Sequence, residues 1–165
     1  MSADTCVPPF VRMAILLVAM AAGCGLPRDA DHTLDRVRNH DLHVGVTENP
    51  PWVKLDAEHV SGVEPSLVGA LASELRARLS FRRGSESELL DALRRGELEL
   101  VVGGFHGDSP WKARIALTKP YYTDTATGTT RVVAVRAGEN AWLVHVETFL
   151  DAHQAAVDST LRAER

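Results

Sequence analysis

Five segments that alternate between strand-like and helix-like patterns lie between Asp41 and Gly104, and this order restricts the fold more than any other feature. Three short apolar runs are separated by two segments with helical periodicity. The order strand, helix, strand, helix, strand is typical of right-handed crossovers that build a mainly parallel sheet flanked by helices. The five segments are residues 41–47, 64–79, 80–84, 85–96 and 97–104. The sequence therefore predicts the α/β class.

The two helical segments carry independent signals. Leucines recur every four residues along the first segment, which predicts one core-facing stripe. The stripe consists of Leu67, Leu71, Leu75 and Leu79. In the second segment Ser85 and Glu88 have the spacing of a capping box, and Gly96 is the expected C-cap. Both segments are therefore predicted to be helices that pack on the sheet.

The last part of the chain predicts one more strand and one more helix. "RVVAVRAG" (131–138) is strand-like, and Asn140 is a suitable N-cap for a following helix. Apolar residues then recur with helical spacing at Trp142, Val146, Phe149 and Leu150. This strand and helix are expected to complete the domain, which we place at residues 41–165.

The N-terminal residues predict an export signal. "VRMAILLVAMAAGCG" contains an apolar run of the length of a signal-peptide core, which is too short to cross a membrane as a helix. "AAGC" resembles a bacterial lipobox, so residues 1–24 are predicted to be a signal peptide and Cys24 to be acylated and anchored to the membrane. The alternative is a general signal peptide with an incidental cysteine. Residues 25–40 are expected to form a polar tether.

Charge and motif content exclude several function classes. The net charge is −4 and no basic stripe is present, which argues against a nucleic-acid partner. His106 and Asp108 are the best candidates for catalysis or metal binding, but no second cluster of ligands accompanies them. The usual nucleophile, phosphate-loop and zinc motifs are missing. We therefore expect neither an enzyme nor a metal or other cofactor.

Two loops are predicted to form a binding site. Ligands of open α/β sheets bind at the carboxyl ends of the strands, and the loops there are "TENPPW" and "GGFHGDSPW". Their glycines would let a ligand approach the backbone, and their aromatic rings would cover an apolar portion of it. The candidate ligand-binding residues are Glu48, Trp52, Gly104, Phe105, His106, Asp108 and Trp111. Alternatively, these glycines only form turns and the tryptophans pack locally.

Four motifs in a fixed order resemble the family 3 extracellular solute-binding proteins, which are type 2 periplasmic binding proteins. They are "LHVGVTENPPW", "SGVEPSLVGALASEL", "ELLDALRRGELELVVGG" and "LTKPYYTD". The resemblance implies an exported, periplasmic protein that binds a small polar or amino-acid-like solute. It also implies a permease of an ABC importer or another membrane protein as the partner.

The resemblance also implies that only the first lobe of that fold is present. In the family the chain crosses into a second lobe after the "PYY" motif and then returns. Here only "TDTATGTT" (123–130) separates "PYY" from "RVVAV". That segment is too short to hold a lobe, so a turn is expected to join the two crossover strands.

A second departure concerns the ligand's carboxylate. Relatives carry a Ser or Thr and then an Arg in the loop after the third strand, and here His106 and Trp111 stand at those positions. Lys112 and Arg114 lie close by but are displaced. Loss of one charge-assisted hydrogen bond weakens binding by about ten- to a hundredfold, so we expect the solute to bind weakly. The alternative is a protein-interaction or sensor module without a transport ligand, in which the open rim of the lobe binds a partner or a second copy.

Overall fold

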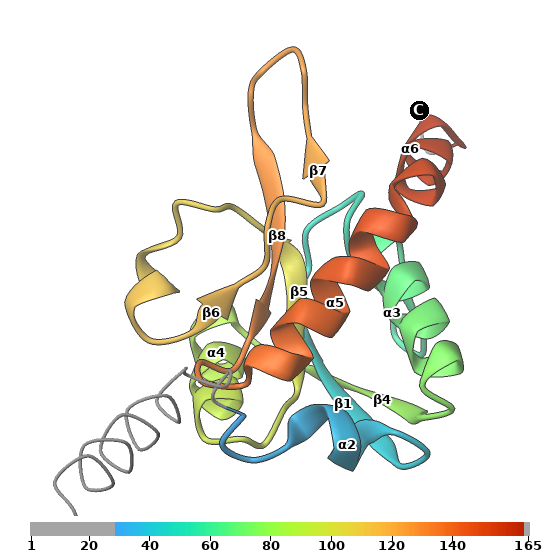
Figure 1. Ribbon diagram of the computed structural model, residues 1–165. Helices are drawn as coiled ribbons and strands as arrows, with labels where there is room; N and C mark the ends of the chain where they lie inside the picture. The colour runs from blue at the N-terminus through green and yellow to red at the C-terminus, as the bar shows by residue number, and fades with distance from the viewer. Residues whose placement is uncertain (1–28, 164–165) are drawn as a thin grey trace, which may run out of the picture.

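Alternation of strands and helices over residues 41–105 builds the centre of one sheet (Figure 1). The structure is a computed structural model that describes residues 29–163 of the 165. Strands β4, β1 and β5 lie parallel to one another, and β8 returns antiparallel beside β5. The strands are β1 (Asp41–Val46), β2 (Lys54–Leu55), β3 (Val60–Ser61), β4 (Arg78–Arg83), β5 (Leu100–Phe105), β6 (Ala116–Leu117), β7 (Tyr122–Thr123) and β8 (Thr130–Val135). The sheet order is β4-β1-β5-β8-β6, with β7 paired to β8.

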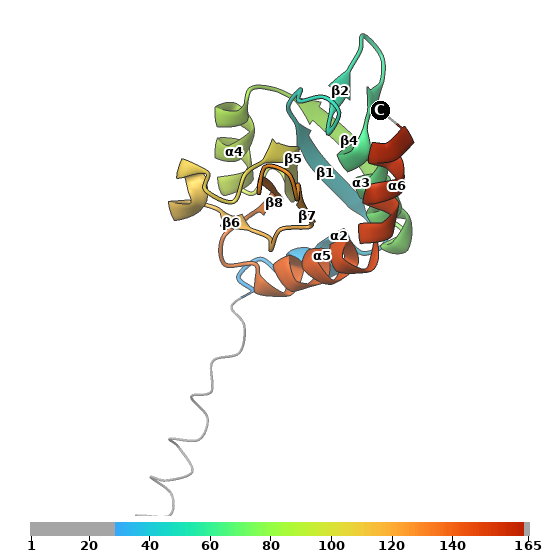
Figure 2. The same ribbon diagram turned by 90° about the horizontal axis from the view of Figure 1, so that it is seen from above.

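Helices cover both faces of this sheet, as Figure 2 shows with α4 on one side and α3 and α6 on the other. They are α2 (Thr33–Val37), α3 (Val63–Glu74), α4 (Glu86–Arg94), α5 (Asn140–Ala152) and α6 (Gln154–Ala163), with a short 3-10 turn, η1, at Pro110–Ala113. The predicted α/β class with a mainly parallel sheet is thereby confirmed.

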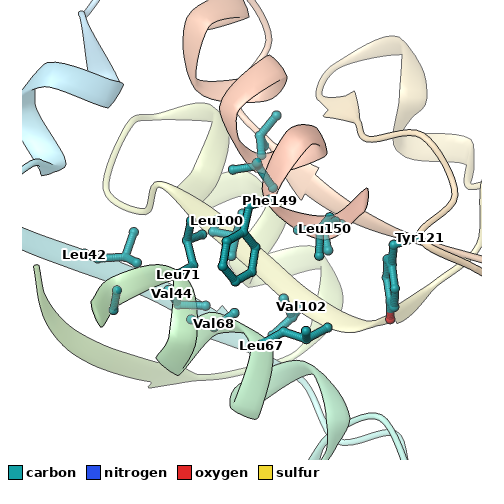
Figure 3. Packing of buried hydrophobic residues seen from close by; sticks show 14 of the residues in the cluster. Leu42, Val44, Leu67, Val68, Leu71, Leu100, Val102, Tyr121, Phe149 and Leu150 are labelled. Carbon is teal, nitrogen blue, oxygen red and sulfur yellow. The ribbon is translucent and has the colours of Figure 1, made fainter. Parts of the chain in front are cut away.

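Alternate residues of the central strands supply two hydrophobic cores. Val133 and Val135 of β8 point to the core under α3 and α5, whereas Val132 and Ala134 point to the core under α4. This follows from the two-residue period of a strand. Figure 3 shows the larger core, where leucines of α3 and Phe149 of α5 meet the sheet.

Helix α3 is shorter than its leucine stripe predicts. The helix ends at Glu74, because Arg76 adopts a left-handed conformation with φ of 53° and the Ala77 N–H bonds the Ala72 carbonyl at 2.8 Å. The chain then enters β4, so the fourth leucine of the stripe, Leu79, lies on a strand. It still packs against the larger core, which explains why its spacing imitated a helix.

The capping-box prediction for α4 is confirmed. The Ser85 hydroxyl accepts from the Glu88 N–H, and the Glu88 carboxylate accepts from the Ser85 N–H at 3.0 Å. Helix α5 begins at Asn140, so Glu139 and not Asn140 is the N-cap residue. The Glu139 side chain forms no capping hydrogen bond with the helix. Instead the buried Glu139 carboxylate accepts from Asp31 N–H at 2.8 Å and Thr33 N–H at 3.1 Å, at the start of α2.

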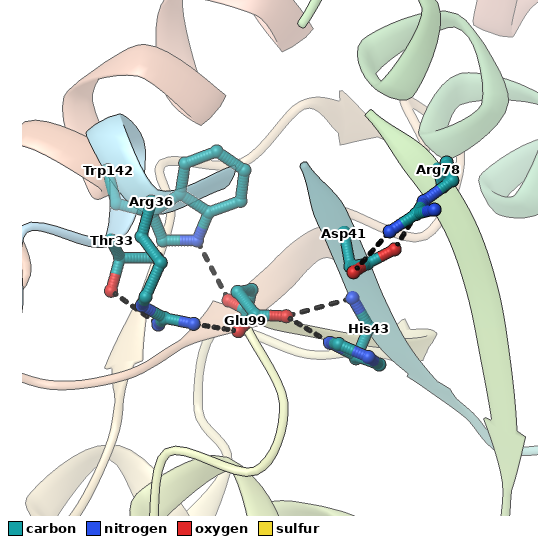
Figure 4. Close-up of polar contacts among 7 residues, drawn as sticks. All are labelled: Thr33, Arg36, Asp41, His43, Arg78, Glu99 and Trp142. Carbon is teal, nitrogen blue, oxygen red and sulfur yellow. Dashed lines mark hydrogen bonds and ion pairs between the residues drawn. The ribbon is translucent and has the colours of Figure 1, made fainter. Parts of the chain in front are cut away.

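The folded domain begins before Asp41, within the segment expected to be a tether. Val37 of α2 is fully buried, and Arg36 donates to the buried Glu99 carboxylate at 2.7 Å. Figure 4 shows how Glu99 also accepts from the His43 N–H, while its carbonyl accepts from Trp142 Nε1 at 2.8 Å. One buried carboxylate residue thus joins α2, β1 and α5. Because α2 is rich in polar residues, the sequence predicted a tether there and not a helix packed on the domain.

A hairpin replaces the crossover to a second lobe. Strand β7 pairs with β8 in antiparallel register, with Tyr122 opposite Arg131 and Thr123 opposite Thr130. The hairpin rises above the end of the sheet in Figure 1. The predicted single lobe is confirmed.

Candidate functional site

The loops that follow β1 and β5 meet at the carboxyl end of the parallel strands. Asn49 Nδ2 donates to the Gly103 carbonyl at 2.9 Å. Gly104 has a φ of 63°, and a Cβ there would lie 2.6 Å from Asn49 Nδ2 and 3.0 Å from Trp52 Cδ1. A side chain at Gly104 is therefore excluded both by conformation and by space.

A buried carboxylate fixes this junction from below. Glu64, on the first turn of α3, is 1% exposed. Its Oε2 accepts from the Gly104 N–H at 2.8 Å, and its Oε1 accepts from the Tyr121 hydroxyl at 2.6 Å. Burial raises the pKa of Glu64, against the hydrogen bonds from Tyr121 and Gly104, which lower it. The hydrogen bond from Glu64 thus fixes the position of the Gly104 backbone at the carboxyl end of β5.

Arg131 contacts residues of both loops at this end of the sheet. This half-buried residue of β8 donates from Nη1 to the Gly104 carbonyl at 2.7 Å and to His106 Nε2 at 2.6 Å. Because a guanidinium only donates, His106 accepts here through Nε2 and carries its proton on Nδ1. The guanidinium carbon also lies 5.0 Å from the centre of the Trp52 ring, within cation–π distance.

Two hollows open at this end of the molecule. The loop hollow, of about 510 Å³, is lined by Asn49, Glu86, Gly103, Gly104, Phe105, His106, Asp108, Ser109 and Pro110. The hairpin hollow, of about 380 Å³, is lined by Pro51, Trp52, Tyr122, Asp124, Thr127, Thr129, Arg131 and Leu161. Both have the volume of a small-molecule site and mix polar with apolar groups.

The predicted site residues are distributed unevenly between these hollows. Four of them line the loop hollow, namely Gly104, Phe105, His106 and Asp108. The Phe105 side chain is nonetheless buried in the core under α4. Glu48 is exposed and lines neither hollow.

The two tryptophans of the predicted site lie apart. Trp52 is 5% exposed, packs against Tyr121 and Tyr122, and lines the hairpin hollow. Trp111, on η1, packs against the core under α4 and lies beneath the Arg114 guanidinium, outside both hollows. Of these two rings, Trp52 lines a hollow at the ends of the parallel strands and Trp111 does not.

Sequence reasoning did not single out Arg131, Asn49, Glu64 or Asp124. Arg131 opens a strand-like run, where a charged residue is usually solvated, and its place at the rim depends on the pairing of β8 with β5 and β7. Glu64 precedes the leucine stripe, and an acidic residue is common in the first turn of a helix, so it gave no sign of a further role. The Asn in "ENPPW" was the one available signal, because an Asn beside two prolines marks a turn.

Two further observations concern metals and membranes. Within residues 29–163 no three His, Cys, Asp or Glu side chains are grouped as ligands for a metal ion. In the same range, no helix combines the length and apolar character that a membrane span requires.

Comparisons with known proteins agree with this architecture. The family described as bacterial extracellular solute-binding proteins, family 3, matches residues 42–161. No curated protein sequence matches the chain. Among solved structures, the arginine-bound domain 1 of TmArgBP (Phe57Trp mutant) superposes with a TM-score of 0.66 at 20% identity, covering 74% of this chain and 98% of that one.

Two other solved structures show the same fold. An ancestral cationic amino-acid solute-binding protein has a TM-score of 0.69 at 15% identity, over 80% of this chain and 99% of that one. An arginine-specific periplasmic binding protein of Salmonella typhimurium has a TM-score of 0.65 at 13% identity, over 76% and 99%. The family match spans most of the chain and the fold agrees with a single domain of these proteins. The chain belongs to family 3 of the bacterial extracellular solute-binding proteins.

Proposed function

We propose that this chain is an exported, lipid-anchored lobe that binds one amino acid weakly and reversibly for ABC-type uptake or sensing. The observation that carries the proposal is the pair of mixed polar hollows at the carboxyl ends of β1 and β5, set on a backbone fixed by Glu64. Export follows from the family, whose description is extracellular. The family description also names solute binding and no catalysis, so we infer binding without chemical conversion.

An amino-acid ligand is supported by the solved relatives. They are described as binding arginine or cationic amino acids, and one of them is a single domain in its arginine-bound form. L-Arginine is therefore the first probe. An open lobe buries less of a ligand than two closing lobes do, so we expect a dissociation constant no tighter than about 1 µM.

Thermal shift with the twenty amino acids, small amines and organic acids at millimolar concentration tests this proposal. We expect at least one amino acid to raise the melting temperature. In an amide NMR titration the same ligand should then shift the signals of Asn49, Gly104 and Arg131, while those of α2 stay in place. A panel in which no compound raises the melting temperature or shifts a rim signal would overturn the proposal.

The alternative of an interaction module has less support from the surface. It requires exposed aromatic residues at the rim, yet Trp52 is buried and Trp111 packs on the core under α4. Within residues 29–163 the one large hydrophobic side chain that is well exposed is Val144 of α5, at 58%. Dimerisation through the rim, measured by sedimentation without ligand, would favour the module instead.

The lipid anchor has its own test, since Cys24 and the predicted signal peptide lie outside the described residues. We expect Cys24→Ser to move the full-length protein from the membrane fraction to the soluble fraction or to leave it unprocessed. The reason is that a serine offers no thiol for acylation. Cys6→Ser, which precedes the predicted cleavage site, is the matched control and should change nothing. An unaltered fractionation of Cys24→Ser would refute the anchor.

A further inference from the structure

Arg131 differs from most other arginines within the described residues in its ion pairing, and its environment suits the binding of an anion. Seven other arginines of residues 29–163 pair with carboxylates, namely Arg36, Arg38, Arg78, Arg82, Arg94, Arg95 and Arg136. Arg131 is half-buried and forms no such ion pair within the same residues, although Glu64 attracts it through space. Only its Nη1 has protein acceptors there, the Gly104 carbonyl and His106 Nε2. The N–H groups of Nε and Nη2 therefore stay available on the same guanidinium plane.

The hairpin hollow gives those N–H groups a place to bind. Arg131 lines this hollow and does not line the loop hollow. The Trp52 ring lies within cation–π distance of the guanidinium carbon, and the bonds to Gly104 and His106 hold Nη1 in place. A planar fork held in this way matches a carboxylate through two parallel hydrogen bonds. Glu64 also attracts Arg131 through space, but its oxygens already accept from Tyr121 and Gly104.

The remaining wall of the hairpin hollow suits the rest of an amino acid. Asp124 lines it, and its Oδ1 accepts from the Ala126 N–H at 2.8 Å and the Thr127 N–H at 3.4 Å. These bonds orient a carboxylate in the same hollow as Arg131. Trp52 and Tyr122 add aromatic surface, with ring centres 5.1 Å apart. Besides the Arg131 guanidinium, the hollow thus offers an apolar aromatic wall, which suits the side chain of an amino acid.

We propose that Arg131 binds the carboxylate of the amino-acid ligand in the hairpin hollow, and so replaces the arginine that the loop after β5 lacks. The inference rests on the proposed function and specifies its site. It moves the ligand from the predicted loop residues to β8 and the β7–β8 hairpin. It also makes a free carboxylate the feature that the protein selects.

The test compares an amino acid with its own carboxamide, in which a neutral amide replaces the carboxylate. The strongest binder of the thermal-shift panel and its amide (for L-arginine, L-argininamide) are titrated by calorimetry. The wild-type protein should bind the amide about ten- to a hundredfold more weakly. Arg131→Gln should weaken the amino acid by that factor, leave the amide unchanged and abolish the difference. Arg131→Lys, which keeps the charge but not the fork, should retain part of it.

Arg114→Gln is the matched control, because Arg114 also lies over a tryptophan but lines neither hollow. It should preserve the wild-type preference for the carboxylate. If Arg131→Gln keeps that preference, or weakens both ligands equally, the assignment of Arg131 is wrong while the proposed function stands. If the wild type binds no amino acid, both fall together. Arg131→Lys decides the assignment alone if the glutamine variant does not fold.

Discussion

Replacing Trp142 with alanine is expected to lower the free energy of unfolding by about 3–5 kcal/mol, the usual cost of removing a large aromatic side chain from a core. Trp142 is fully buried and is the largest side chain so enclosed within residues 29–163. Its indole N–H donates to the Glu99 carbonyl, so the variant also leaves a buried acceptor without its partner. Urea denaturation followed by circular dichroism measures the change.

Trp111→Ala is the control for this prediction. Trp111 is half-buried on the short turn η1, and its loss should cost clearly less than the loss of Trp142. Equal destabilisation by the two variants would mean that the core around α5 is not the main source of stability. A Trp142→Ala protein that unfolds within about 1 kcal/mol of the wild type would contradict the packing described here.

Replacing Glu64 with alanine is expected to destabilise the fold strongly at neutral pH. The variant leaves the Tyr121 hydroxyl and the Gly104 N–H buried without an acceptor, at about 1–3 kcal/mol for each. Glu64→Gln should be milder, because an amide oxygen still accepts from Gly104 while the amide N–H₂ donates to the Tyr121 oxygen. Denaturant midpoints of the two variants give the comparison.

The pH dependence separates the charge of Glu64 from its hydrogen bonds. Burial raises the native pKa of Glu64 above its ordinary value of 4.5, so the folded state holds the proton to a higher pH than the unfolded chain does. Its contribution is therefore fully present below 4.5 and is lost as the pH rises through the native pKa. Glu64→Gln should remove this fall in the free energy of unfolding.

Glu88 provides a control of opposite sign. The hydrogen bonds from Ser85 hold the pKa of this exposed carboxyl below its ordinary value. Its stabilisation is present above that ordinary value and is lost on acidification, so Glu88→Gln should flatten the acid side of the stability profile. If the wild type and Glu64→Gln gave parallel profiles, the burial of Glu64 would carry no ionisation cost and the prediction would fail.

The features predicted from the sequence are those that neighbouring residues determine. The capping box of α4 needs only Ser85 and Glu88, and the stripe that buries Trp142 needs only one helix. The family motifs extended these local signals to the order of the sheet and to the missing lobe. Polar residues of the tether hid α2, because its docking depends on Glu99 and Glu139, which lie far away in the sequence.

The candidate site was harder to predict, because distant segments build it. Arg131 reaches Gly104 and His106 across 27 and 25 residues of sequence, and a charged residue at the start of a strand reads as solvated. Trp52 follows two prolines in a loop, and no residue near it in the sequence predicts how far it is buried. The packing of Tyr121 and Tyr122 buries it. Burial of this kind depends on the hairpin, which has no local signature at Trp52.

The β7–β8 hairpin has a consequence for the timing of binding. Two-lobed periplasmic binding proteins open and close about a hinge between their lobes, whereas here the loop of residues 124–129 joins β7 directly to β8. Under the proposed function, exchange of the amino acid would need no opening step. With an association rate constant of about 10⁶ M⁻¹s⁻¹ and a dissociation constant of about 1 µM or weaker, the ligand leaves about once per second or faster. Occupancy of the site would thus follow the surrounding amino-acid concentration within about a second. Such a response suits a sensor of that concentration better than a protein that retains its ligand.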